Sequence, residues 1–442
     1  MDNIEKIEND SEEIVRETVE EIKNEDELKE NSDILAKESK KEDRKKFFFG
    51  LGLIVLALAV IVAVVAIILI NKNNDEGGGV SLIVDDEEIS VGENTELTGG
   101  SVTTTIGGQS VTYRAAYVVD GITATISSGD FASNSDDEVV FLVINGGTLN
   151  IGGEVTISKN GSDGSQGRGD KYSFYGLNSA VVVVGEGSSA LIKGAKVVTN
   201  ASGANAVVAT NGGKATIQNV DISTTKDNSR GLHATYAGEI IAENVSIVTK
   251  GGSCAALATD RGEGIVTANR MNLSTEGAGS PLIYSTGTIT VYNSNGTASG
   301  AQIAVVEGKN SISLSDCDFS ANGNGNRNDV DNAGVMIYQS MSGDANVGEG
   351  SFVAEDCKFT ILKESDVYMV TPMFFVTNTS ATIKLSNVRA DFYEDGYFLL
   401  AKGTEEWGKS GKNGGNVKLE TLGLEATNAN IGVDEISSVE SL

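Results

Sequence analysis

The sequence predicts an all-β solenoid, a parallel β-helix, over residues 80–442. A short apolar and polar phrase recurs along the chain, as in ATIQNVDIS (215–223) and IIAENVSIV (240–248). Successive copies from residue 190 to residue 311 are 25, 25, 24, 24 and 23 residues apart. Each copy has several short runs rich in Val, Ile and Thr, separated by turn residues. A regular period of this size is typical of a solenoid, in which each unit buries its apolar face against its neighbours.

Each repeat unit is predicted to contain three short strands. The runs NAVVAT, KATIQN and VDIST follow one another, and turn residues such as NGG and TKDNSRG separate the runs. The Leu skeleton of leucine-rich repeats is missing, although the period would suit it. We therefore expect about eleven rungs, which begin near residues 122, 148, 190, 215, 240, 264, 288, 311, 352, 381 and 417.

The repeated phrase also predicts which side chains are buried. Ile217, Val220 and Ile222 should face the core, and Asn219 should occupy a bend between two strands. Asn and Asp tolerate bent backbone and can bond to neighbouring amides. We interpret the column as structural; it continues as Asn244, Asn293, Asp316, Asp356 and Asn387, with Gly194 and Arg270 as departures.

Two longer segments, GGTLNIGGEVTIS (146–158) and NGGKATIQNVDIS (211–223), carry a family resemblance. They resemble the right-handed parallel β-helix of the pectin-lyase-like superfamily, in particular its adhesin-like and autotransporter-passenger-like members. The resemblance implies the fold for residues 80–442. It leaves the activity open, because this fold serves lyases, hydrolases and binding proteins alike.

An apolar segment near the N-terminus predicts a membrane anchor. Residues 47–70 are 24 residues without a charge or a proline, enough for about 36 Å of helix. Basic residues precede this segment, so the positive-inside bias predicts a cytoplasmic N-terminus. We expect an acidic cytoplasmic helical segment (1–46), a single transmembrane helix (47–70), a linker (71–79) and an extracellular β-helix at the cell membrane.

The net charge of −29 excludes two classes of partner. An acidic surface repels the phosphates of nucleic acids and of anionic lipid headgroups, so we expect no nucleic-acid partner. The acidic balance suits a soluble extracellular domain, or one that binds cations. An extracellular glycan or a surface protein is the partner that we expect for such a domain.

Catalytic patterns known in enzymes of this fold are incomplete in the chain. The single histidine, His233, is followed by Ala, and no Arg-x-Lys motif accompanies it. Its place in a strand predicts a satisfied or partly exposed imidazole. Asp260 and Arg261 form one isolated acid and base pair at a corner. We assign no catalytic residue, although carboxylates alone can cleave glycosides.

The three cysteines have no metal-ligand spacing, so we expect no zinc site. Cys317 and Cys357 occupy the same register of consecutive rungs, about 4.8 Å apart, which is within the Cα range for a disulfide. Two buried thiols are the alternative. We expect no cofactor; calcium stays open, since NGNGNRNDVDN (322–332) resembles a loose Ca²⁺ loop without the EF-hand order.

The best candidate for a binding site is the corner that two insertions share. Segments 342–350 and 404–416 both enter just before the repeated phrase, two rungs apart. Trp407, the only tryptophan, could stack on a sugar ring, or could pack on its own loop. The polar partners predicted for the ligand are Lys409 and Lys412 for an acidic group, and Asp344 and Glu349 for hydroxyls.

The leading hypothesis is a membrane-anchored cell-surface protein with a non-catalytic, adhesin-like or glycan-binding role. A polysaccharide lyase or glycoside hydrolase is the first alternative. A structural spacer in the cell envelope is the second.

Overall fold

The computed structural model describes residues 93–162, 171–325, 331–340, 345–404 and 413–441. The chain divides after Gly78, and every described residue belongs to the second unit, Gly79–Leu442. The predicted cytoplasmic segment 1–46, transmembrane helix 47–70 and linker 71–79 therefore lie outside the described residues. Within the described part, no helix has the length and apolar character needed to cross a membrane.

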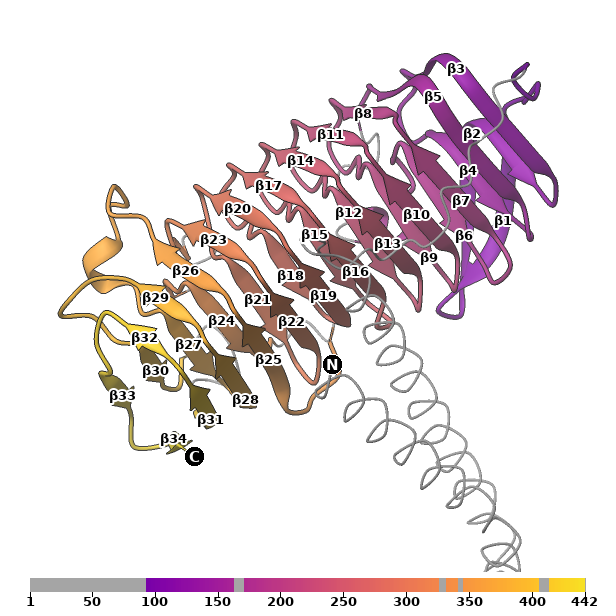
Figure 1. The fold of residues 1–442 in the computed structure, drawn as a ribbon. Coiled ribbons are helices and arrows are strands. Elements are labelled where there is room, and N and C mark those ends of the chain that lie inside the picture. The colour runs from indigo at the N-terminus through magenta and orange to yellow at the C-terminus, as the bar shows by residue number, and fades with distance from the viewer. Residues whose placement is uncertain (1–92, 163–170, 326–330, 341–344, 405–412, 442) are drawn as a thin grey trace, which may run out of the picture. The chain divides into compact units, whose positions relative to one another are not determined.

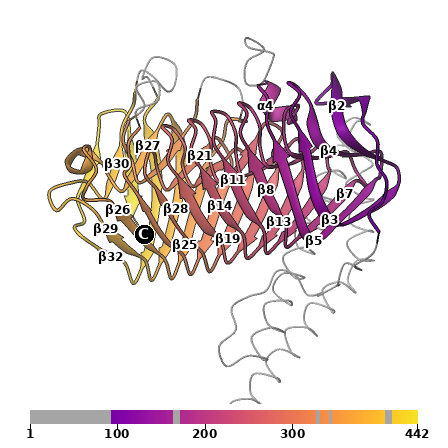
Figure 2. The same ribbon diagram turned by 90° about the horizontal axis from the view of Figure 1, so that it is seen from above.

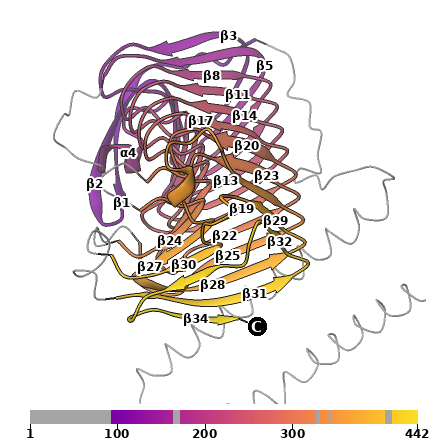
Figure 3. The same ribbon diagram turned by 90° about the vertical axis from the view of Figure 1, so that its left-hand side faces the viewer.

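The described residues form a coil of short parallel strands, as expected for a β-helix. They contain a 13-stranded sheet and a 21-stranded sheet, and the larger one bends between two parallel ladders. A regular rung, from β6 to β32, thus contributes one strand to each of three ladders, which we call sheets 1, 2 and 3. Figure 1 shows the rungs following one another from the N-terminal to the C-terminal end of the unit, and Figure 3 shows the strands of each sheet one behind another.

Sheet 1 is the 13-stranded sheet, and its strands are parallel apart from the first pair. Its strands are β1 (Gly100–Ile106), β2 (Gln109–Asp120), β4 (Val139–Ile144), β6 (Val181–Val184), β9 (Val207–Thr210), β12 (Leu232–Thr235), β15 (Leu257–Asp260), β18 (Ile283–Ser285), β21 (Ala304–Glu307), β24 (Val335–Tyr338), β27 (Phe374–Thr377), β30 (Leu399–Ala401) and β33 (Ile431–Val433).

Sheet 2 contains the strands of the repeated phrase. They are β3 (Thr123–Ser133), β5 (Thr148–Lys159), β7 (Ser189–Lys193), β10 (Lys214–Gln218), β13 (Glu239–Glu243), β16 (Ile265–Asn269), β19 (Thr288–Tyr292), β22 (Ser311–Ser315), β25 (Gly350–Glu355), β28 (Thr379–Ser386), β31 (Gly415–Leu422) and β34 (Ser438–Ser441). The first eleven of these strands lie at the eleven predicted rungs, so the predicted repeat is confirmed; β34 was not predicted.

Sheet 3 completes each rung. It contains β8 (Lys196–Thr199), β11 (Asp221–Thr224), β14 (Ser246–Thr249), β17 (Asn272–Thr275), β20 (Asn295–Ala298), β23 (Asp318–Ala321), β26 (Lys358–Ile361), β29 (Arg389–Asp391) and β32 (Glu425–Ala426). The long strand β5 pairs with both β7 and β8, so it belongs to sheets 2 and 3. Two short helical segments, α4 (Lys171–Tyr175) and η1 (Tyr368–Val370), lie between sheets 3 and 1 (Figure 2).

The core is a stack of apolar columns inside the coil. Residues in one register of successive rungs pair directly, as Ile222 does with Ile247, and as Phe319 does with Phe359 across a much longer step. All eight side chains predicted to face the core are buried, namely Ile217, Val220, Ile222, Ile247, Cys317, Phe319, Cys357 and Phe359. The predicted alignment is therefore confirmed, including the step of about 40 residues between the two cysteines.

The bend between sheets 2 and 3 is made by one residue in the left-handed region. Its φ is 52° at Asn219 and between 46° and 54° in the other non-glycine members of the predicted column, which are Asn244, Arg270, Asn293, Asp316, Asp356 and Asn387. Asn244 Nδ2 donates to Asn219 Oδ1 at 2.6 Å, so some members bond along the stack. The column is structural in the way the sequence predicts.

The corner from sheet 1 to sheet 2 requires glycine in several rungs. A Cβ atom at Gly238 would lie 2.1 Å from the carbonyl oxygen of Ala209 in the preceding rung, and one at Gly213 would lie 2.4 Å from that of Val183. Because the obstacle is backbone, a larger residue could fit only if the rungs moved apart.

The N-terminal end of the coil has a hairpin that the repeat does not predict. Strands β1 and β2 are antiparallel, with Ile106 opposite Gln109 across Gly107 and Gly108. Just before β1, Asn94 Oδ1 accepts from the Ser127 amide at 2.8 Å, so the segment covers part of the edge of β3. Edge strands otherwise present unpaired backbone groups that favour unwanted association.

Candidate functional site

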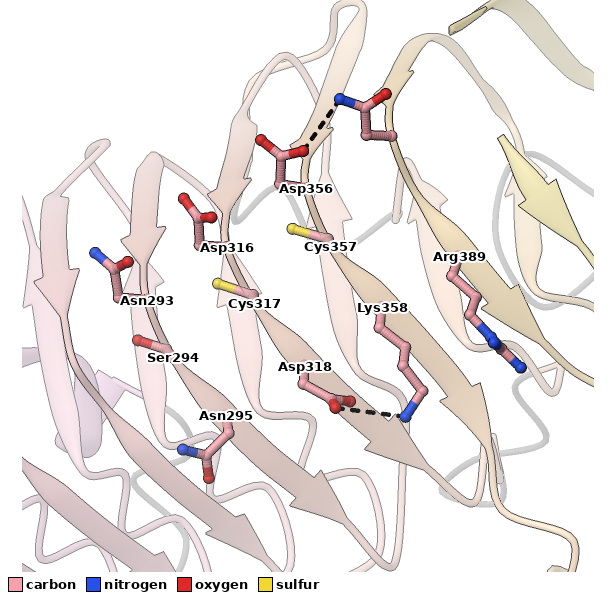
Figure 4. A pocket seen from close by; sticks show the side chains of 11 residues that line it. Asn293, Ser294, Asn295, Asp316, Cys317, Asp318, Asp356, Cys357, Lys358 and Arg389 are labelled. Atoms are coloured by element: carbon pink, nitrogen blue, oxygen red, sulfur yellow. Dashed lines mark hydrogen bonds and ion pairs between the residues drawn. The ribbon is translucent and has the colours of Figure 1, made fainter. Parts of the chain in front are cut away.

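The bend between sheets 2 and 3 opens into a groove along the stack. Its volume is about 720 Å³. Three side-chain columns line it: the bend column (Asn293, Asp316, Asp356, Asn387), a floor column (Ser294, Cys317, Cys357) and the first residues of the sheet 3 strands (Asn295, Asp318, Lys358, Arg389). We call these eleven residues the bend groove (Figure 4).

The charges of the bend groove are partly compensated. Lys358 Nζ lies 3.4 Å from Asp318 Oδ2 on the neighbouring rung. Asn387 Nδ2 donates to Asp356 Oδ1 at 3.1 Å. The hydrogen bond to Asp391 raises the pKa of Arg389, which keeps that guanidinium charged. The groove thus offers amides, carboxylates and cations at rung spacing, which is suited to hydrogen bonding with a polar ligand.

A second group of polar residues lies on the outer face of sheet 1, but it is buried. Arg230 Nη2 is 3.1 Å from Asp260 Oδ2, and His233 Nε2 is 3.4 Å from the same oxygen. The His233 side chain is fully buried, and neither ring nitrogen has a hydrogen bond of good geometry. The imidazole is therefore fully buried rather than partly exposed, with Nε2 facing the Asp260 carboxylate, because helix α4 covers this face.

Burial dominates the ionisation of His233. It lowers the pKa of the imidazole to about 4, the Arg230 guanidinium contributes to the lowering, and Asp260 opposes both. A neutral imidazole next to an Arg–Asp pair, without access to solvent, is an arrangement for packing rather than for proton exchange with a substrate.

Helix α4 is the element that covers this cluster. Thr235 Oγ1 donates to the carbonyl of Phe174 at 2.9 Å, and Arg230 Nη1 donates to Ser173 Oγ at 2.9 Å. The Phe174 ring also lies 4.4 Å from the Arg261 guanidinium. These contacts hold α4 on β12 and account for the burial of Asp260.

A further carboxylate is buried on the same face, two strands along. The hydroxyls of Tyr284 and Tyr338 lie 2.5 Å and 3.2 Å from Glu307 Oε2, and Ser340 donates to the other oxygen. Burial, and then the Glu307 charge, raise the pKa of both tyrosines far above its ordinary value. Glu307 is thus fully engaged by neutral donors.

The predicted binding corner is described only in part. Asp344, Trp407, Lys409 and Lys412 lie outside the described residues. Glu349 is described: Thr382 donates to its Oε1, and Lys418 Nζ lies 3.9 Å from the same oxygen. These contacts span the rungs of β25, β28 and β31, so Glu349 lies at the corner where the sequence predicts it.

A small hollow of about 330 Å³ lies at this corner. Its lining comes from the rung between the two insertions, from the described end of the second one and from the connection between β33 and β34. It consists of Asn378, Thr379, Ser380, Asn413, Gly414, Asn416 and Ile436. Thr379 Oγ1 also donates to the carbonyl of Gly348 at 3.0 Å, so the first insertion touches the intervening rung.

The sequence has four segments that are longer than the repeat requires, 158–175, 322–332, 342–350 and 404–416, and all four connect to sheet 1. The first two precede β6 and β24, whereas the last two follow β24 and β30. One kind therefore lies at the start of sheet 1 strands and the other at their end. The order of the runs within each unit could have predicted that the insertions border one sheet. That prediction requires each of the three runs to be assigned to a sheet first.

The three cysteines are free thiols in this structure, and all are buried. The disulfide between Cys317 and Cys357 remains a prediction. Among the described residues, no three His, Cys, Asp or Glu side chains gather in a way that would hold a metal ion.

Comparisons with known proteins do not name a family for this chain. No protein-family model, no curated protein and no solved structure gave a match. The fold thus stands on the strand register, and the resemblance to the pectin-lyase-like superfamily remains a proposal.

Proposed function

We propose that the chain is a membrane-anchored cell-surface protein whose β-helix binds a polar glycan without cleaving it. One observation carries the proposal: the bend groove presents polar side chains in columns, whereas Asp260 and Glu307 on sheet 1 are buried and engaged. The columns repeat every rung, about 4.8 Å. That repeat is close to the length of one residue in an extended polysaccharide.

The proposed ligand is rich in hydroxyls. Asp318 would accept hydrogen bonds from them, Asn295 would accept or donate, and Lys358 would donate to an oxygen acceptor. We also propose the right-handed, pectin-lyase-like coil that the sequence resembles, since parallel strands joined by crossovers are right-handed in most folds.

Binding should weaken when the third column of the groove is truncated. We expect the double variant Asp318→Ala/Lys358→Ala to bind a glycan selected on an array at least about a hundredfold more weakly, because charged hydrogen bonds contribute about 1.5–3 kcal/mol each. Asp221→Ala is the matched control, since Asp221 begins the sheet 3 strand β11 but lies outside the groove. Titration of the full-length protein measures the affinities.

Three other outcomes would contradict this placement. Equal affinity of the double variant and wild type would show that the glycan does not bind in the bend groove. Loss of affinity in Trp407→Ala, with an unchanged melting temperature, would place the ligand at the corner of 342–350 and 404–416. If the protein binds no glycan on the array, the structural spacer becomes the favoured function.

An enzyme of the pectin-lyase-like class is the second candidate. The observation that favours it is the pair Asp260 and Glu307, two rungs apart on the sheet that the insertions border. Release of shorter products from the selected glycan, and its loss in Glu307→Gln, would establish this function in place of simple binding.

The proposed topology has its own test. Protease added to intact cells should digest the region 80–442 and leave 1–46 protected, because the span 47–70 with its basic flank keeps the N-terminus in the cytoplasm. Epitope tags at the two ends report which part survives. An intact C-terminal region on cells that remain sealed would reject the extracellular assignment.

A further inference from the structure

Two thiols lie next to each other in the floor of the bend groove. Cys317 and Cys357 precede Asp318 and Lys358, which pair directly between β23 and β26. The Lys358 amide donates to the Cys317 carbonyl at 2.7 Å, so the rungs are in contact at this point. Cys317 Sγ donates to the Ser315 carbonyl at 3.2 Å and Cys357 Sγ to the Glu355 carbonyl at 3.1 Å, so both thiols sit in the same way on neighbouring rungs. Figure 4 shows both sulfur atoms between the bend column and the first residues of sheet 3.

The two thiols differ in character. The interaction with the Cys317 side chain lowers the pKa of Cys357 below its ordinary value. The same interaction, together with burial, raises the pKa of Cys317. A thiolate is the nucleophilic form of cysteine, so Cys357 is the more reactive of the pair and Cys317 is the neighbour that holds a proton.

The third cysteine provides a comparison within the chain. Cys254 is fully buried, and its Sγ lies 3.1 Å from the Lys226 carbonyl and 3.1 Å from the Ser229 amide. It belongs to a different column and does not line the groove. It therefore shares the burial of the other two but neither the thiol neighbour nor the opening.

A disulfide between Cys317 and Cys357 would close a long segment of the chain. The segment between Cys317 and Cys357 contains the insertions 322–332 and 342–350, and this step between two rungs of sheet 3 is as long as the one from β5 to β8. A disulfide between the two ends of this segment would hold the rungs of β23 and β26 together in any conformation of the insertions. Closing a loop of this length also restricts the unfolded chain.

We propose that Cys317 and Cys357 form a dithiol that a small hydroperoxide oxidises to a disulfide. The Cys357 thiolate attacks one peroxide oxygen, the O–O bond breaks, and Cys357 becomes a sulfenic acid while the other oxygen leaves as water or alcohol after taking a proton. Cys317 then attacks the sulfenic sulfur; the S–S bond forms, the S–O bond breaks, and hydroxide leaves as water with the Cys317 proton. Two thiols are oxidised and one peroxide is reduced. This chemistry is independent of the proposed glycan binding.

The test uses full-length protein treated with one equivalent of hydrogen peroxide. After alkylation and digestion, mass spectrometry should find the 317–357 cross-linked peptide in wild type and in Cys254→Ser. In Cys317→Ser, the sulfenic acid at Cys357 should accumulate and be trapped by dimedone, because its partner is missing. Oxidised wild type should melt a few degrees above reduced wild type.

Serine should be tolerated in this column, since Ser294 occupies it on the preceding rung with its hydroxyl donating to the Tyr292 carbonyl. Unchanged melting temperatures of the reduced variants show that they fold. The proposal is overturned if the native protein yields no cross-link, if Cys254 is oxidised as readily as Cys357, or if dimedone labels Cys317 rather than Cys357.

Discussion

Asp260→Ala should lower the free energy of unfolding by about 3–5 kcal/mol, because it leaves a buried cation without its partner. The side chains of Asp260 and Arg230 are 3% and 12% exposed, and their charged atoms are 3.1 Å apart. Water cannot replace the carboxylate once α4 covers the site. Urea unfolding of the full-length protein, followed by circular dichroism, measures the loss.

Asp318→Ala is the control for this prediction. Asp318 also pairs with a cation on a neighbouring strand, but its side chain is 60% exposed. An ion pair of this kind contributes about 0–1 kcal/mol. Equal losses in Asp260→Ala and Asp318→Ala would show that α4 does not keep water from the Arg230–Asp260 pair.

Acid should destabilise the fold through His233, by about 3 kcal/mol between pH 6.5 and pH 4. The folded pKa is about 4 and the ordinary value is 6.5. Between these values the unfolded chain binds the proton and the folded chain does not, so stability falls as the pH falls. Above pH 6.5 both states are neutral, and His233 adds no pH dependence.

His233→Leu isolates this contribution, because the chain has one histidine. The substitution should be tolerated at neutral pH, since Val208 and Ala258 occupy the same register on the neighbouring strands. Melting curves of both proteins from pH 7.5 to pH 4 give the comparison. Carboxylates affect both proteins alike, so parallel losses would rule out His233 as the source.

The sequence predicted the regular part of the fold because the repeated phrase records burial residue by residue. Ile217 and Val220 face the core for the same reason that their counterparts do in every rung, and Asn219 bends the chain because few residues accept a positive φ. The hairpin of β1 and β2 was not predicted because it does not repeat. Two adjacent glycines between runs of alternating apolar and polar residues are nevertheless a hairpin signal.

The buried cluster could not be predicted in the same way. Its members come from β12, β15 and a helix about 60 residues earlier in the chain, and nothing in the local pattern around His233 indicates that α4 lies on it. The predicted corner depends on Trp407, which lies outside the described residues. The bend groove was hidden for another reason: its residues were correctly identified as structural, and that role does not exclude a binding surface.

The spacing of the rungs also determines how such a chain can change in length. Residues Ala190, Ala215 and Ile240 replace one another in register, 25 positions apart. Loss or duplication of one whole unit would leave every remaining column aligned, whereas removal of a single residue within a strand would turn core side chains outward. Genetic variation in this region should therefore be tolerated in multiples of one unit, with the glycine corners and asparagine bends as natural junctions.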